Sequence, residues 1–266
     1  MTAAAIHLVL AGVFAVGLLM FALWVIHLWI GNAAIVDVGW AGGLALLAVL
    51  YAALGNGYSL RAGLIAAMAC VWGLRLALYL FFTRVIGQPE EGRYVQIRKE
   101  WKTNIPLKFL GFYEFQALLC VLMSGPFLFP ALNPRPNLST IEFAGAALWI
   151  AGIAGEAAAD AQLKAFKSHP QNRGRTCRSG LWNYSRHPNY FFEWLVWMGF
   201  AVFALGSPHG FIGIISPALI LYFLLRVTGI PATEAQALRT KGDDYREYQR
   251  TTSAFVPWFP RKEKTA

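Results

Sequence analysis

The string with the most chemical potential in this chain is SRHPNYFFE, residues 185–193. Pro188 can begin a helix, because its fixed φ and missing N–H suit the first turn. Side chains able to bind a ligand would lie on that first turn or just before it: Arg186, His187, Asn189, Tyr190 and Glu193. Since helix N-termini favour anions, the string predicts a site for an anionic ligand that polar groups orient.

A second group of polar residues occurs in AGEAAADAQLKAFK, residues 154–167. Glu156 and Asp160 are four residues apart, so both carboxylates share one helix face, and Lys164 continues the same stripe. Asp160 could pair with Lys164 at the helix end, or the carboxylates could receive ribose hydroxyls or an amide. Helix spacing leaves both interpretations open.

Asp37 is the only charged residue between Met1 and Leu60, in the stretch AAIVDVGWAGG. A charge at membrane depth costs about 2.5–3.5 kcal/mol on insertion scales, so Asp37 needs a partner or a function. It could form an ion pair with Arg75, or its carboxyl group could stay protonated and donate a hydrogen bond to a substrate carbonyl. Tyr79 and Tyr94 could supply phenolic donors or anchor the chain at the membrane interface.

Several classes of site lack their motifs. The chain has no HExxH, no paired histidines and no Gly-rich phosphate loop, which argues against a metalloprotease, a P-loop enzyme and a soluble dinucleotide-binding domain. Its three cysteines form no CxxC pair, so neither a disulfide framework nor a zinc site is indicated. We expect no metal.

The composition indicates the elements that must position these residues. The chain of 266 residues is 57% hydrophobic and only 14% charged, where a soluble domain has about a quarter charged residues. A bilayer core needs about 20 apolar residues per helix. We expect an all-α polytopic membrane protein, a single membrane domain over 1–266, with seven spans at 6–30, 35–55, 60–82, 109–130, 141–163, 190–206 and 211–228.

The basic residues predict the orientation. The loops 84–108 and 164–190 and the tail from residue 226 hold 20 of the 23 Lys and Arg residues. The positive-inside rule places both loops and the tail 229–266 in the cytoplasm and the N-terminus outside, as expected in a bacterial inner membrane. The net charge of +9 is concentrated beside spans, so it indicates lipid headgroups or an anionic pocket and no nucleic acid.

Taken together, six segments resemble the steroid 5-alpha-reductase-like membrane reductases, in particular a bacterial branch of them. These segments are VDVGW, WGLRLALY, EEGRY, AGEAAAD, GLWNYSRHPNYFFE and DDYREYQRTTSAFVPWFP, and they extend over nearly the whole chain. The resemblance implies a seven-helix enzyme with NADPH in its cytoplasmic half. Such an enzyme reduces a carbon–carbon double bond conjugated to a carbonyl, as a 3-oxo-5-alpha-steroid 4-dehydrogenase does. A hydrophobic substrate would enter from the lipid phase.

The resemblance also implies roles for individual residues. Arg93, Tyr94 and Arg98 would contact phosphates, Lys167 and Arg175 would lie near the phosphates of the adenosine, Asp160 and Glu156 would hold its ribose region, and Asn189 and Glu193 would orient the nicotinamide amide. Asp37 would polarise the carbonyl, with Tyr79 as a second catalytic candidate. The remaining expected cofactor residues are Arg75, Lys164, Arg186, His187, Tyr190, Glu234 and Tyr245. Phe192 stands where the family often has Gly.

Two other functions remain as alternatives. Membrane methyltransferases of the isoprenylcysteine or phospholipid type, which use S-adenosylmethionine, share an Arg-His-Pro-x-Tyr string, a later Glu and a closing Tyr-x-x-Tyr; Glu234, Tyr245 and Tyr248 suit them as well. A non-enzymatic lipid-binding protein would use intramembrane acids to line a path and basic loops to hold headgroups. We expect a monomer or a weak homo-oligomer.

Overall fold

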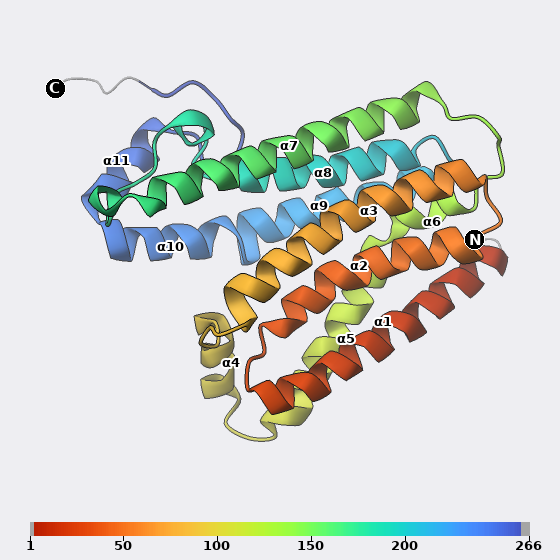
Figure 1. Cartoon of the computed structure of the whole chain (residues 1–266), viewed down its shortest axis with the longest axis horizontal. Coiled ribbons are helices and arrows are strands. Elements are labelled where there is room, and N and C mark those ends of the chain that lie inside the picture. Colours follow the sequence, from red (N-terminus) through yellow and green to blue (C-terminus); the bar gives the residue numbers. More distant parts are fainter. Residues whose placement is uncertain (1–2, 262–266) are drawn as a thin grey trace. The chain divides into compact units, whose positions relative to one another are not determined.

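The computed structural model describes residues 3–261, and every regular element within them is a helix (Figure 1). The expected all-helical fold is therefore confirmed for these residues. The last part of the expected tail, residues 262–266, lies outside the described residues.

Six helical runs in the described residues are long and apolar enough to cross a membrane, so the chain is a helical membrane protein. They are α1 (Ala3–Ile30), α2 (Ile35–Leu54), α3 with the π turn η1 (Ser59–Val85), α5 (Ile105–Met123), α7 (Thr140–Ser168) and the run Gly210–Lys241. That last run contains η4 (Gly210–Ile214), α9 (Ile215–Tyr222), the π turn η5 (Phe223–Val227) and α10 (Ile230–Lys241).

The expected span that is not among these six runs, 190–206, corresponds to α8, Pro188–Ala204. Its 17 residues give a length of about 26 Å, close to the lower limit for crossing a hydrocarbon core of about 30 Å. Seven spans and the proposed orientation stay predictions.

Three segments differ from the expected pattern. The expected span 109–130 is two helices, because α5 ends at Met123 and α6 begins at Gly125, with Pro126 in its first turn. The expected loop 84–108 contains α4, Gly92–Trp101, and the expected tail contains α10 and α11, Asp243–Thr251. Both α4 and α11 are short and polar, with tyrosines on their buried sides. Neither contains an apolar run of membrane-spanning length, which is the pattern that predicted the other helices.

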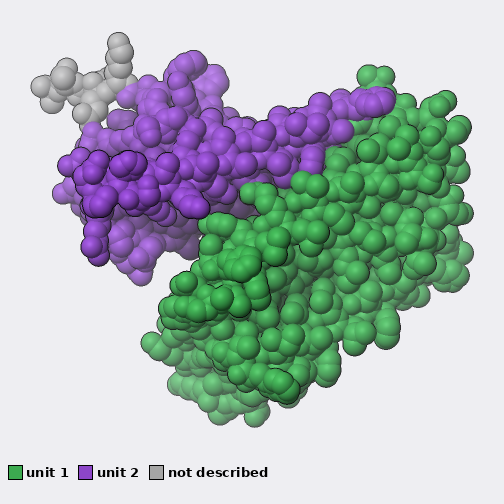
Figure 2. Space-filling view, viewed as in Figure 1, with its two compact units in different colours: residues 1–142, 203–216 green, residues 143–202, 217–266 purple. Residues whose placement is uncertain are grey.

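The chain forms two compact units, each described here by itself (Figure 2). Unit 1 comprises residues 1–142 and 203–216, and unit 2 comprises residues 143–202 and 217–266. The single domain expected from the sequence stays a prediction.

In unit 1, α2 packs against α1, α3, α5 and α6. Small residues allow close approach of the backbones: a Cβ added at Gly73 of α3 would lie 2.8 Å from the carbonyl oxygen of Ala41 on α2. Large aromatic side chains fill the remaining space, and Tyr51, Trp72 and Tyr113 are fully buried. This packing fixes the first turn of α2, which carries Asp37.

A buried ion pair closes one end of unit 1. The guanidinium of Arg61, at the start of α3, binds the Glu142 carboxylate, and their side chains are 1% and 0% exposed. Arg61 also donates to the carbonyl oxygens of Asn133, Arg135 and Asn137 at 3.0, 2.7 and 2.6 Å. One arginine therefore ties α3 to the α6–α7 connection and to the first turn of α7.

Arg61→Met is expected to destabilise the protein by about 3–5 kcal/mol, because it leaves the Glu142 carboxylate buried and unpaired. The thermal unfolding midpoint in detergent measures this. Arg61→Met/Glu142→Met should recover part of the loss, since no lone charge remains. Arg135→Met, which removes an exposed guanidinium, serves as the control; an equal loss in this variant would contradict the assignment.

Candidate functional site

The first polar cluster of unit 1, here called the Asp37 cluster, consists of Asp37, Arg84, Glu91, Arg93 and Tyr94. Asp37 accepts hydrogen bonds from Nη1 of Arg84 at 3.2 Å, from Nη2 of Arg93 at 2.8 and 3.1 Å, and from the Tyr94 hydroxyl at 2.8 Å. Arg84 also donates to Glu91 at 2.9 Å. Both carboxylate oxygens of Asp37 therefore accept hydrogen bonds, and their donors are two guanidinium groups and one phenol.

Local backbone geometry brings these groups together. The π turn η1 at the end of α3 carries Arg84, and such turns often occur at functional positions. The helix α4 presents Arg93 and Tyr94 from the following segment. Burial, and then the Asp37 carboxylate, raise the pKa of the fully buried Tyr94 phenol far above its ordinary value. Tyr94 thus stays protonated and donates to Asp37.

A second cluster in unit 1 joins Glu90, Arg98 and His27. Arg98 donates to both oxygens of Glu90 at 2.8 and 3.0 Å, and its Nη2 lies 2.7 Å from Nε2 of His27. The backbone N–H of Ala33 donates to Glu90 at 2.8 Å. Burial opposes ionisation of Glu90, but the hydrogen bonds from Arg98 and Ala33 outweigh it and lower its pKa.

These contacts bear on the expected phosphate-binding residues of the first basic loop. Arg93 and Arg98 each form an ion pair with a carboxylate. Arg84, which was not among the expected residues, does so as well. Three guanidinium groups therefore face three carboxylates, those of Asp37, Glu90 and Glu91. A phosphate would have to compete with these ion pairs.

In unit 2, α7 and α8 pack backbone to backbone. A Cβ added at Gly152 would lie 2.7 Å from the Val196 nitrogen, and one at Gly199 would lie 2.6 Å from the Trp149 nitrogen. This packing brings Asp160 on α7 to Asn189 on α8, whose Nδ2 donates to Oδ1 of Asp160 at 3.4 Å.

The carboxylates of this helix pair differ in exposure. Glu156 is buried, whereas Glu193 is half-buried and accepts a hydrogen bond from the Trp197 indole at 3.1 Å. Asp160 and Asn189 are half-buried as well. We call the group formed by Glu156, Asp160, Asn189 and Glu193 the α7–α8 polar face.

The basic side chains that follow this face along the chain differ from the paired arginines of the first basic loop. The end of α7 and the loop after it hold four exposed basic side chains with no carboxylate partner among the described residues: Lys164, Lys167, Arg173 and Arg175. The alternative in which Asp160 pairs with Lys164 is not the arrangement observed. Two other arginines of the second basic loop, Arg178 and Arg186, bind carboxylates. In the first basic loop all three arginines are paired.

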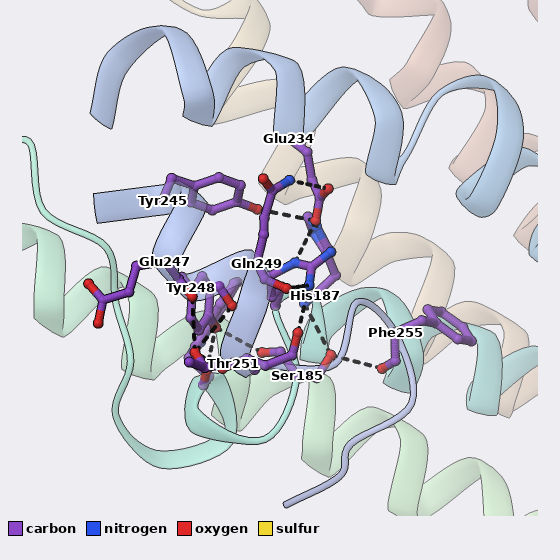
Figure 3. Close-up of polar contacts among 12 residues, drawn as sticks. Ser185, His187, Glu234, Tyr245, Glu247, Tyr248, Gln249, Thr251 and Phe255 are labelled. Atoms are coloured by element: carbon purple, nitrogen blue, oxygen red, sulfur yellow. Dashed lines mark hydrogen bonds and ion pairs between the residues drawn. The ribbon is translucent and has the colours of Figure 1, made fainter. Parts of the chain in front are cut away.

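The residues of the Arg-His-Pro string take part in what we call the Glu234 cluster, which Figure 3 shows. Oε1 of Glu234 lies 2.7 Å from Nε of Arg186, 3.2 Å from Nε2 of His187 and 3.4 Å from the Tyr245 hydroxyl. Oε2 accepts from Nε2 of Gln249 at 2.8 Å. Burial, and then Glu234, raise the pKa of Tyr245, which keeps its hydroxyl protonated. The Glu234 carboxylate thus accepts hydrogen bonds from four side chains.

The end of the chain completes this cluster. Arg186 donates to the carbonyl oxygens of Gln249 and Thr252 at 3.0 and 2.6 Å. The Tyr248 hydroxyl, fully buried, donates to the carbonyls of Trp182 and Ser185 (Figure 3). The α11 helix therefore holds the segment that leads into α8.

Three further expected residues are Tyr79, Arg75 and Tyr190. Tyr79 is 55% exposed on α3, and Arg75 is half-buried on the same helix. Tyr190 stacks on His187 with ring centroids 5.3 Å apart and hydrogen-bonds Thr233 at 3.0 Å. No group of three or more His, Cys, Asp or Glu among the residues described here could hold a metal ion.

Sequence reasoning missed Arg84, His27 and Gln249. Arg84 ends a span and was counted only as a charge that indicates orientation. His27 lies in an apolar helix with no polar neighbour in sequence. Gln249 lies 15 residues after Glu234, and only the turn between α10 and α11 brings the two together. The EEGRY motif was the one signal that could have pointed to Glu90 and Glu91.

Comparison with known proteins gives one match. A family profile described as "Protein of unknown function (DUF1295)" matches residues 23–252, which is most of the chain, and the chain therefore belongs to that family. No curated protein and no solved structure matches it.

Glu90→Gln is expected to lower the thermal midpoint at neutral pH, because Arg98 and Ala33 bind the ionised carboxylate. Because the pKa of Glu90 is lower in the folded state, its ionised carboxylate stabilises the fold, and this stabilisation is complete at pH values above the ordinary pKa of 4.5. The stabilisation is lost as the pH falls through the folded-state pKa. The midpoints of the two proteins should therefore converge in acid. Glu100→Gln, on the exposed side of α4, is the control. A difference between wild type and Glu90→Gln that persists in acid would refute the assignment.

Proposed function

We propose that this member of the DUF1295 family is an NADPH-dependent membrane reductase that reduces a carbon–carbon double bond conjugated to a carbonyl in a hydrophobic, steroid- or lipid-like substrate. The observation that carries this proposal is the set of uncompensated cations beside the α7–α8 polar face. The proposal also rests on the resemblance of the sequence motifs to such reductases.

The donor set of unit 2 fits the parts of this cofactor. Lys164, Lys167 and Arg175 supply positive charge for phosphates, and arginine can bind a phosphate bidentately. The Asp160 carboxylate can accept from ribose hydroxyls, and the Asn189 side chain can both donate to and accept from an amide. The contact between Asp160 and Asn189 holds the amide in a defined orientation.

The same cations favour NADPH over S-adenosylmethionine. A dinucleotide with a 2′-phosphate is strongly anionic, whereas S-adenosylmethionine has a positively charged sulfonium and no phosphate. Four basic side chains with no carboxylate partner in the described part of the chain attract the former and repel the latter. The methyltransferase alternative is therefore the less suitable one for this loop.

The chain's own residues would then act by binding and orientation. Bound NADPH supplies a hydride, and the protein provides the geometry. We assign polarisation of the substrate carbonyl to the Asp37 cluster, because reduction places negative charge on that oxygen and preorganised donors stabilise it. Asp37 and the Tyr94 hydroxyl hold Nη2 of Arg93 in place, so the other N–H groups of this partly exposed guanidinium can serve as donors. Tyr79, exposed on α3, stays a second candidate.

Ligand-induced thermal stabilisation tests the cofactor assignment. NADPH is expected to raise the unfolding midpoint of the detergent-purified protein more than NADH or S-adenosylmethionine, because a ligand of the folded state stabilises it by mass action. Lys167→Gln/Arg175→Gln and Asp160→Ala should each weaken NADPH binding by about tenfold or more, as expected for lost charge-assisted hydrogen bonds.

Arg239→Gln and Asp243→Ala are matched controls, since both remove exposed charges of unit 2 away from the α7–α8 polar face. They should retain wild-type affinity. A shift with S-adenosylmethionine alone would replace the reductase by a methyltransferase, and no shift with any of the three ligands would favour a lipid-binding protein.

Asp37→Asn is expected to lower the rate of NADPH oxidation with a panel of hydrophobic enones by about 100-fold, the usual effect of disturbing one preorganised donor group. NADPH affinity should stay at the wild-type value, because the cofactor residues proposed here belong to unit 2. Wild-type turnover in Asp37→Asn would remove the Asp37 cluster from catalysis.

A further inference from the structure

A pocket of about 450 Å³ lies in unit 2 between the end of α11 and the segment 252–261. It borders the Glu234 cluster through Arg186 and Gln249, and none of its lining residues belongs to the α7–α8 polar face. Its lining combines basic, hydroxyl and aromatic side chains, among them Arg186, Arg250, Thr251, Trp258, Phe259 and Arg261. A cavity with this lining suits a ligand that has both an anionic and an apolar part.

The segment that forms the pocket wall is held by its backbone. The Arg186 N–H donates to the Ser253 carbonyl, the Trp258 N–H to the Tyr184 carbonyl, and the Arg261 N–H to the Thr251 carbonyl, each at 2.8 Å. Its conformation is therefore determined by main-chain hydrogen bonds that do not involve the side chains of Trp258 and Arg261.

Three apolar side chains of this segment are exposed, whereas Phe255 is buried. Val256, Trp258 and Phe259 are 53%, 69% and 76% exposed. Such a group of exposed apolar side chains on an ordered segment marks an interaction surface. Tryptophan and phenylalanine beside basic residues are typical of segments that lie in the membrane interface.

The charge of the pocket identifies the anionic part of the ligand. Arg186 is engaged by Glu234, whereas Arg261 has no carboxylate partner among the described residues. Lys262 and Lys264 follow Arg261 in the sequence, with only one acid, Glu263, between them. Basic residues next to a membrane span attract anionic headgroups, at about 1 kcal/mol per residue.

The pocket also lies close to a span along the chain. The candidate span Gly210–Lys241 is followed directly by α11, whose nine residues extend about 14 Å. Segment 252–261 begins where α11 ends, so only one short helix separates it along the chain from that candidate span.

We propose that this pocket, the C-terminal pocket, binds the phosphate group of an anionic phospholipid, while Trp258 and Phe259 insert beside its acyl chains. Arg261 contacts the phosphate, beside Thr251, whose hydroxyl donates to the Glu247 carbonyl at 3.2 Å. The ligand is a membrane lipid and not a soluble anion, because the exposed aromatic wall matches acyl chains. The site is independent of the proposed reductase activity.

Binding of short-chain lipids to the detergent-purified full chain tests the proposal. Dihexanoyl phosphatidylglycerol is expected to raise the thermal midpoint with higher affinity than dihexanoyl phosphatidylcholine, and the preference should fall with added salt. Arg261→Gln keeps the backbone hydrogen bond to Thr251 and should weaken phosphatidylglycerol binding about fivefold. Trp258→Ala should weaken the binding of both lipids.

Arg239→Gln removes one exposed positive charge of unit 2 outside the pocket and should bind both lipids as wild type does. Equal affinity for the two lipids, unchanged binding in Arg261→Gln, or an equal loss in Arg239→Gln would overturn the proposal. Displacement of the lipid by millimolar inorganic phosphate or by NADPH would assign the pocket to a soluble anion instead. Failure of NADPH to bind anywhere would leave the lipid result unaffected.

Discussion

The cost of taking charge out of water determines how unit 1 arranges its ionisable groups. Arg61 and Glu142 are buried as a pair, and the remaining N–H groups of Arg61 are satisfied by carbonyl oxygens. The same condition governs Asp37, which accepts from two guanidinium groups and a phenol. A lone charge in either place would cost several kcal/mol, so each cluster persists only as a complete set. Complete sets are rigid, and rigidity is what a group of preorganised donors requires.

In unit 2, the end of α7 and the start of the second basic loop carry basic side chains that are not paired in this way. Lys164, Lys167 and Arg175 are exposed and have no carboxylate partner within residues 3–261, so water and salt screen their mutual repulsion. Binding of an anion by these side chains costs little free energy, because no ion pair has to break. The paired arginines of the first loop would have to exchange partners for the same purpose. This difference is the physical reason for assigning phosphates to the second loop before the first.

Composition and the absence of charges from long runs were enough to predict an all-helical membrane protein, because the hydrophobic requirement of a span is local. The shared face of Glu156 and Asp160 was predictable too, since helix spacing sets it. The contact of Asp160 with Asn189 was not, because it depends on Gly152 and Gly199 letting two helices touch. Arg75 was a reasonable partner for Asp37 by depth alone. The π turn that carries Arg84 and the short helix α4 decide the actual partners, and neither leaves a periodic signal.

The Glu234 cluster shows how the Arg-His-Pro string depends on the end of the chain. Arg186 and His187 come from the segment before α8, Glu234 from α10, and Tyr245 and Gln249 from α11. The carbonyl oxygens of Gln249 and Thr252 also accept hydrogen bonds from Arg186. If α11 moved away from the segment before α8, the Arg186 guanidinium would therefore lose several partners at once. The loss is therefore cooperative, and the start of α8 stays ordered only while α11 is docked. A lipid bound in the C-terminal pocket would stabilise that docking, since the Thr251 side of the pocket belongs to α11 itself.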